Sequence, residues 1–85
     1  MDIEQAVNLY DERRYEEAYE LFIDLAIDAK NDEAQYYLGR MYRDGDGVRR
    51  DIEKAKYWWK KARRQGNRDA AYAMSEFEIS TKNMF

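Results

Sequence analysis

One stretch of the sequence, residues 34–66, reads AQYYLGRMYRDGDGVRRDIEKAKYWWKKARRQG and predicts two amphipathic helices joined by a glycine-containing loop. In its first half, apolar residues recur at spacings of four, seven and eight, which places them on one helical face; these are Ala34, Leu38, Met41 and Tyr42. In its second half, spacings of three, seven and ten do the same for Ile52, Ala55, Trp59 and Ala62. Because one such hairpin cannot bury its own apolar face, the segment needs neighbouring helices.

The glycines of this segment predict where its helices end and how closely they pack. Gly45 and Gly47 accept the positive φ that ends a helix and turns the chain. Gly66 stands where a helix C-terminus favours glycine. Gly39, inside the first helix, is expected to leave room for a neighbouring backbone.

Polar residues before the helices predict their N-caps. Asp51 is the expected N-cap of the second helix of the segment, and Asn67 that of a later helix. Asp32 and Gln35 are spaced as in a capping box, which we expect at the start of the first helix of the segment.

The flanking sequence predicts three more helices with the same periodicity, over residues 2–11, 15–29 and 69–80. The chain contains no proline and is rich in good helix formers, so little interrupts a helix. We therefore predict an all-α fold of about five helices, with residues 81–85 as a tail.

The sequence also repeats itself in two registers. A shift of 36 residues aligns apolar and capping residues of the third and fifth helices: Asn31 with Asn67, Ala34 with Ala70, Tyr36 with Tyr72, Leu38 with Met74 and Met41 with Phe77. A shift of 37 aligns the second helix with the fourth: Tyr15 with Ile52, Ala18 with Ala55, Phe22 with Trp59 and Leu25 with Ala62. Alternate helices are therefore copies of one another, which is typical of a helical repeat.

The composition excludes several kinds of chemistry. With no cysteine and no histidine, the chain has no disulfide, no thiolate nucleophile, no imidazole base and no usual zinc or haem ligand, and we expect no cofactor. No apolar run approaches the roughly 20 residues that span a bilayer. The first residues lack the basic start and apolar centre of a signal peptide, so we expect a cytoplasmic protein with no membrane partner.

Charge is distributed unevenly along the chain. Residues 1–33 carry a net charge of −8 and residues 34–85 a net charge of +5, which gives −3 in total. This polarity bears on association with partners and not on the fold.

The 34–66 segment resembles the Sel1-like repeat family, a relative of the tetratricopeptide repeats. The family pattern A-x-x-x-L-G-x-x-Y-x-x-G-x-G-V-x-x-D-x-x-K-A-x-x-W-x-x-K-A-x-x-x-G is filled by Ala34, Leu38, Gly39, Tyr42, Gly45, Gly47, Val48, Asp51, Lys54, Ala55, Trp58, Lys61, Ala62 and Gly66. The resemblance implies an α/α solenoid, a right-handed superhelix of helix pairs, with no catalytic site and a role in binding proteins. It divides the chain into a tetratricopeptide-like first repeat at residues 1–30, a full repeat at 31–66 and a terminal capping helix with its tail at 67–85.

The resemblance also implies a binding surface. In this superfamily the first helix of each pair lines a concave groove, and the positions flanking its core face here are Glu33, Tyr36, Arg40, Arg43, Tyr72 and Glu76. Tyrosine and arginine often anchor interfaces, so we expect these residues to bind a protein or peptide partner. The alternative is that Tyr36 and Tyr72 pack between adjacent helices.

Other patterns in the sequence favour structural interpretations. Trp59 shares a face with Ala55 and Ala62, so the Trp58-Trp59 pair indicates core packing and not a ligand platform. The acidic loop after residue 43 lacks the glycine and glutamate that an EF-hand needs at its sixth and twelfth positions, so no metal site is expected.

The charged residues do not favour catalysis or nucleic-acid binding. The acids lie mostly on outward helical faces, so we expect no catalytic site and no small-molecule substrate. The basic residues between 49 and 68 indicate a solvated face, because the chain is net acidic and the second helix would repel a duplex.

The sequence leaves two hypotheses of function open. The first is a small adaptor or scaffold that binds a protein through the groove. The alternative is an inhibitor or immunity-type protein whose acidic block, residues 12–33, occludes a basic enzyme or toxin. Two and a half repeats also predict a weak homodimer through the fifth helix, presenting Met74, Phe77, Met84 and Phe85.

Overall fold

The computed structural model describes residues 2–82, with side chains from residue 2 to residue 77, and this part of the chain is helical without strands. Its five helices are α1 (Ile3–Asp11), α2 (Tyr15–Ile27), α3 (Asp32–Asp44), α4 (Ile52–Arg64) and α5 (Arg68–Lys82). The prediction of an all-α fold with about five helices is confirmed.

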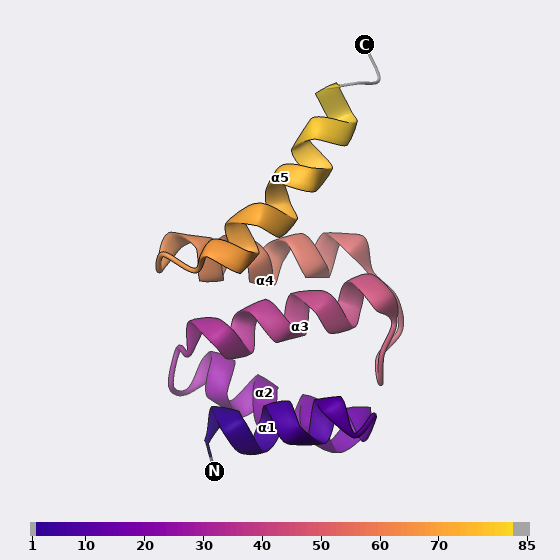
Figure 1. Ribbon diagram of the computed structural model, residues 1–85, viewed down its shortest axis with the longest axis vertical. Helices are drawn as coiled ribbons and strands as arrows, with labels where there is room; N and C mark the ends of the chain where they lie inside the picture. Colours follow the sequence, from indigo (N-terminus) through magenta and orange to yellow (C-terminus); the bar gives the residue numbers. More distant parts are fainter. Residues whose placement is uncertain (1, 83–85) are drawn as a thin grey trace.

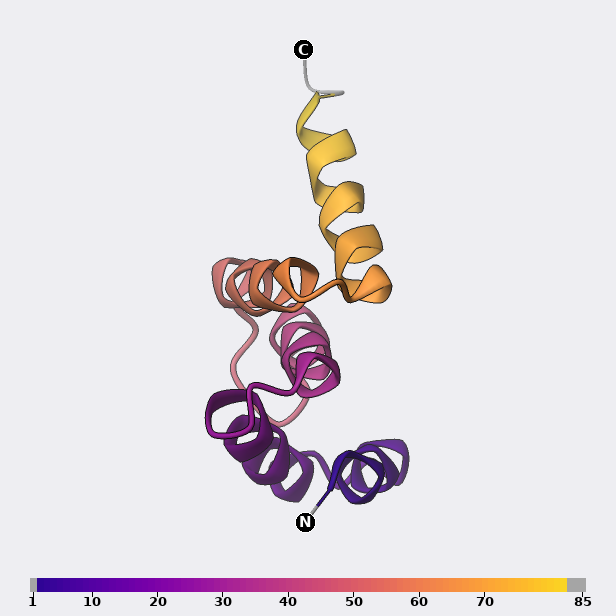
Figure 2. The ribbon, with the colours of Figure 1, turned by 90° about the vertical axis from the view of Figure 1, so that its left-hand side faces the viewer.

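The helices form an elongated stack in which each packs on the next, most extensively α3 on α4 (Figure 1). The stack measures 44 × 25 × 17 Å. Figure 2 shows α1, α3 and α5 on one side of the stack and α2 and α4 on the other. We call these the A-helix side and the B-helix side. The second half of α5 extends beyond the other helices (Figures 1 and 2).

Short polar side chains begin four of the five helices. Each accepts a hydrogen bond from the backbone N–H three residues later, at 2.8–3.1 Å; the caps are Asp2, Asn31, Asp51 and Asn67. The expected caps Asp51 and Asn67 are confirmed. The prediction of a capping box formed by Asp32 and Gln35 is wrong, because Asn31 caps α3. The Gln35 side chain points inward instead and donates to the Ala26 carbonyl at 3.3 Å.

Two helix ends differ from the sequence prediction. α2 ends at Ile27 and not at residue 29, because Lys30 adopts a φ of 51° and the Asn31 N–H turns back to the Leu25 carbonyl at 3.0 Å. Ala29 is therefore exposed. α5 continues to Lys82, so the helix includes the first residues of the expected tail; residues 83–85 lie outside the described part.

The core joins all five helices. Alanines of all five helices are fully buried, and the largest fully buried side chains are Trp59, Phe22, Leu38 and Met41. The predicted burial of Trp59 is confirmed, and Trp58 is also largely buried. Gly39 makes room for the Trp59 side chain and not, as expected from the sequence, for a backbone: the nearest atoms to a Cβ built there all belong to the indole.

Met74 and Phe77 of α5 face inward, whereas the homodimer prediction needed them to face outward. Met74 is buried in the core, and Phe77 packs on Trp59 with 5.7 Å between ring centroids. These two residues are therefore used within the chain. Met84 and Phe85 lie outside the described residues.

Candidate protein-interaction surface

An aromatic cluster fixes α3 to the first helix pair. The Tyr37 ring stacks on Phe22 of α2 with 5.0 Å between centroids and meets Tyr10 of α1 edge-on at 5.3 Å. Tyr36 meets Tyr37 edge-on at 5.5 Å. Offset and edge-to-face contacts of this kind stabilise beyond the area that they bury. The rings thus hold the outer face of α3 in one orientation relative to α1 and α2.

Arg40 adds a positive charge to this cluster. Its guanidinium carbon lies 5.3 Å from the Tyr10 ring centroid, 5.5 Å from that of Tyr37 and 5.9 Å from that of Tyr36. A cation over aromatic faces is attracted by the ring quadrupole. Arg40 is consequently held in place in the middle of the A-helix side, with its charge half-exposed.

Burial makes two tyrosines of the cluster weaker acids than usual. It raises the pKa of Tyr10 to about 12, against which the nearby Arg40 charge acts in part, and it also raises the pKa of Tyr37. The Tyr10 hydroxyl donates a hydrogen bond to Asp46 Oδ2 at 3.4 Å, which ties α1 to the loop between α3 and α4. The hydroxyl groups of Tyr10 and Tyr37 therefore stay protonated, and able to donate hydrogen bonds, to a higher pH than that of an ordinary tyrosine.

Two hollows flank the N-terminal half of α3 on this side. One, of about 430 Å³, lies between α3 and the start of α5; the other, of about 260 Å³, lies between α1 and α3. Glu33 and Tyr37 line both. Tyr36 lines only the hollow toward α5, and Ile3 and Val7 line only the hollow toward α1. The arrangement offers a ridge with aromatic, acidic and basic groups between two recesses.

The structure brings some of the predicted site residues together. Glu33 and Tyr36 line the hollow toward α5, and Arg40 lies one turn along the same face of α3. Arg43 is partly used within the chain, since its guanidinium pairs with Asp44 at 2.8 Å and lies 5.7 Å from the Trp59 ring centroid.

Tyr72 and Glu76 sit apart from this group, on the exposed surface of α5. The Tyr72 side chain is 68% exposed, so the alternative that it packs between adjacent helices is wrong. Tyr36 is half-buried against Tyr37 and Arg40, and so it combines packing with partial exposure.

Sequence reasoning missed Tyr37 as a member of this surface. It contacts the core through Phe22 and still lines both hollows. The available signal was the Tyr36-Tyr37 pair itself, because two adjacent helical residues cannot both point to the centre of the core.

The acidic loop between α3 and α4 uses its carboxylates within the chain. The Arg43 guanidinium hydrogen-bonded to Asp44 lowers the pKa of that carboxyl group. Asp46 accepts from Tyr10, and Asp51 caps α4. Among the residues that the structure describes, no group of three acidic, histidine or cysteine side chains could hold a metal ion.

Stacked helix pairs with alternate helices on one surface define a helical-repeat protein of the α/α solenoid class. Within the chain, residues 32–67 match the family model of the Sel1 repeat, so this segment is a Sel1 repeat. Sel1 repeats typically mediate protein–protein interactions and are not a catalytic family. Comparisons with curated proteins and with solved structures give no significant match. None of the described helices combines the length and apolar character needed to cross a membrane.

Proposed function

We propose that this chain is a small interaction module, an adaptor or scaffold, that binds a protein or peptide partner through its A-helix side. The observation that carries the proposal is the ridge of Glu33, Tyr36 and Arg40 around Tyr37, flanked by two hollows. Interface anchors are enriched in tyrosine and arginine. Side chains that are held in place before binding lose less entropy on association.

The remaining predicted site residues extend this surface in the proposal. Tyr72 and Glu76 contribute from α5, and Arg43 contributes the part of its side chain that Asp44 and Trp59 leave accessible. Residues 1–30, 31–66 and 67–85 act as a first repeat, a full repeat and a closing helix with its tail. The proposed compartment is the cytoplasm, as expected from the sequence.

Affinity capture from the native host with matched tyrosine variants tests the proposal. Tyr72→Ala removes an exposed ring on the A-helix side, and Tyr57→Ala removes one that is 54% exposed on α4. A partner held by the A-helix side is retained by Tyr57→Ala and lost, or weakened at least about fivefold, by Tyr72→Ala and Tyr36→Ala. Equal capture by all variants contradicts the proposal.

A second candidate function is occlusion of a basic enzyme or toxin. It is favoured by the outward face of α2 and the residue that follows it, where five carboxylates are all exposed: Glu16, Glu17, Glu20 and Asp24 on the helix and Asp28 at its C-cap. Clustered charge of one sign accelerates association with a partner of the opposite sign. Occlusion is supported over the adaptor role if the captured partner is one basic enzyme that the chain inhibits in a stoichiometric complex. The Glu20→Lys variant should then fail to hold that enzyme.

A weak homodimer through α5 also remains a proposal. The observation that supports the dimer is that the second half of this helix extends beyond the other helices (Figure 2). Met74 takes no part, because it is buried within the chain. Sedimentation over a range of concentrations tests the dimer: a single monomeric species up to about 100 μM, or about 5.5 kcal/mol of association, contradicts it.

A further inference from the structure

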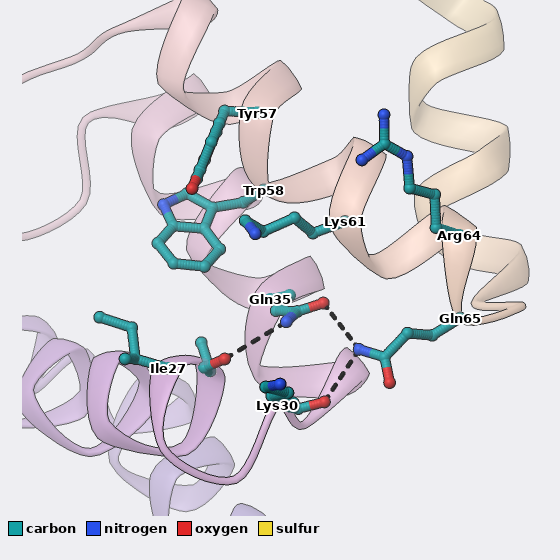
Figure 3. Close-up of a pocket in the computed structure, with 9 residues that line it drawn as sticks. Ile27, Lys30, Gln35, Tyr57, Trp58, Lys61, Arg64 and Gln65 are labelled. Carbon is teal, nitrogen blue, oxygen red and sulfur yellow. Dashed lines mark hydrogen bonds between the residues drawn. The ribbon is translucent and has the colours of Figure 1, made fainter.

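A larger hollow, of about 690 Å³, lies on the B-helix side, where the end of α2, the start of α3 and the second half of α4 meet (Figure 3). Its apolar wall includes Ile27 of α2 and Tyr57 and Trp58 of α4. Its cations are Lys30, Lys61 and Arg64. We call it the B-side pocket. It shares no lining residue with the two hollows on the A-helix side.

Two side chains of the apolar wall are unusually exposed for large hydrophobic residues. Only three large hydrophobic side chains among the described residues are strongly exposed, and two of them, Ile27 at 57% and Tyr57 at 54%, line this pocket. Figure 3 shows Ile27 facing the Trp58 ring across the hollow. Tyr57 meets Trp58 edge-on with 5.1 Å between centroids. Exposed apolar groups gathered at one concave place mark a binding site more often than scattered ones do.

The charge around this wall has one sign. No acidic residue is among those lining the pocket. Within the part of the chain that the structure describes, Lys30, Lys61 and Arg64 form no ion pair. Lys61 instead lies with Nζ 5.2 Å from the Tyr57 ring centroid. In a chain of net charge −3, three unpaired cations beside an apolar wall are complementary to an anionic ligand with an apolar group.

The polar floor of the pocket is already satisfied. Gln65 Nε2 donates to the Lys30 carbonyl at 2.8 Å and to Gln35 Oε1 at 3.0 Å, and Gln35 Nε2 donates to the Ala26 carbonyl (Figure 3). These bonds join α2, α3 and the end of α4, so the shape of the pocket is fixed before binding. A ligand is then recognised by the cations, the apolar wall and the indole N–H of Trp58, which donates no hydrogen bond within the described residues.

We propose that the B-side pocket binds an acidic peptide segment of another protein, distinct from the partner of the A-helix side. One aromatic or large aliphatic side chain of the segment inserts between Ile27 and the Tyr57-Trp58 wall. Its neighbouring carboxylates lie against Lys61, Arg64 and Lys30. A peptide fits better than a nucleic acid, because the hollow offers a single apolar recess and not a continuous track of stacking rings and cations.

The two tryptophans allow a direct test by NMR. Trp58 lines the pocket, whereas the Trp59 N–H is buried and donates to the Tyr36 carbonyl at 3.1 Å. Addition of an acetylated and amidated peptide Glu-Asp-Phe-Asp-Glu, up to about 1 mM, shifts the Trp58 indole cross-peak and leaves that of Trp59 in place. The peptide Lys-Lys-Phe-Lys-Lys, and the acidic peptide with glycine in place of phenylalanine, bind at least about tenfold more weakly.

Matched variants separate the pocket from the general charge of α4. Lys61→Glu and Tyr57→Ala each weaken the acidic peptide at least about fivefold, whereas Lys60→Glu, an equal charge change on an exposed residue outside the pocket, weakens it less than about twofold. An unchanged Trp59 cross-peak in each variant shows that the fold is intact.

Three results overturn the proposal. One is a Trp58 cross-peak that no peptide shifts. Another is equal weakening by Lys60→Glu and Lys61→Glu, which means diffuse attraction to α4. The last is tighter binding of a single-stranded oligothymidine of about eight nucleotides than of the acidic peptide, which assigns the surface to nucleic acid.

Discussion

Gly39→Ala separates the packing in this structure from helix propensity, because the two predict effects of opposite sign. Gly39 lies in the middle of α3, where alanine stabilises an ordinary helix by about 1 kcal/mol relative to glycine. In this protein a Cβ at residue 39 overlaps Nε1 and Cδ1 of Trp59 and lies 2.7 Å from its Cε2. The indole must move to admit it.

The indole has little freedom to move. Trp59 is fully buried, its N–H donates to the Tyr36 carbonyl at 3.1 Å, and Phe77 packs on its ring. Overpacking of this kind costs about 1–3 kcal/mol. Loss of the hydrogen bond costs about 1 kcal/mol more. After the gain in propensity is subtracted, Gly39→Ala should lower the free energy of unfolding by roughly 1–3 kcal/mol.

Urea unfolding followed by far-UV circular dichroism measures this effect, with equal m-values in variant and parent showing that the transition is the same. A double-mutant cycle with Trp59→Phe supplies the control, since the smaller ring leaves space beside residue 39. The cost of Gly39→Ala should then fall by at least about 1 kcal/mol in the Trp59→Phe background. If Gly39→Ala stabilises the parent, or costs the same in both backgrounds, the packing of Trp59 against Gly39 is not as described.

Three further substitutions test other parts of the fold. Trp59→Ala leaves a cavity at the junction of α3, α4 and α5 and should cost about 3–5 kcal/mol, enough to unfold most of a domain this small; coincident urea melts of variant and parent would exclude this burial. Asn67→Ala removes both the α5 cap and the 2.9 Å hydrogen bond from Asn67 Nδ2 to Asp32, whereas Asp2→Ala removes only the α1 cap. In thermal or urea melts, Asn67→Ala should therefore lower the free energy of unfolding by about 1 kcal/mol more than Asp2→Ala does. Burial raises the pKa of Tyr10 to about 12, so the unfolded chain releases this proton at lower pH than the native state does. The contribution of Tyr10 to the free energy of unfolding is therefore complete below about pH 10 and is lost as the pH rises toward 12. Tyr10→Phe should lose less stability over this pH range than the parent, by about 1.4 kcal/mol for each unit by which the pKa of Tyr10 is raised.

The helices were predictable because their signals are local. Periodicity located all five helices. Asp51 and Asn67 were recognisable as N-caps because each accepts a hydrogen bond from the backbone N–H only three residues later. The end of α2 was not predictable in the same way, because the left-handed Lys30 that stops it carries no glycine signal.

The packing and the candidate sites depend on residues far apart in the sequence. The role of Gly39 required knowing that Trp59 crosses it, and periodicity does not say which residue of α4 meets which residue of α3. The B-side pocket likewise joins Ile27 to Tyr57, two exposed residues that come together because α2 and α4 both pack on α3. Tyr37 was not predicted as a site residue, because its ring both packs on Phe22 of the core and lines a hollow at the surface.

The central claim is that the A-helix side binds a protein partner, and NMR mapping of a captured partner tests it most directly. With labelled chain and unlabelled partner, the claim predicts that the largest amide shifts fall on the outward faces of α1, α3 and α5, centred on Glu33, Tyr36 and Arg40 and extending to Tyr72. Shifts confined to the acidic face of α2, with the A-helix side unchanged, would contradict it.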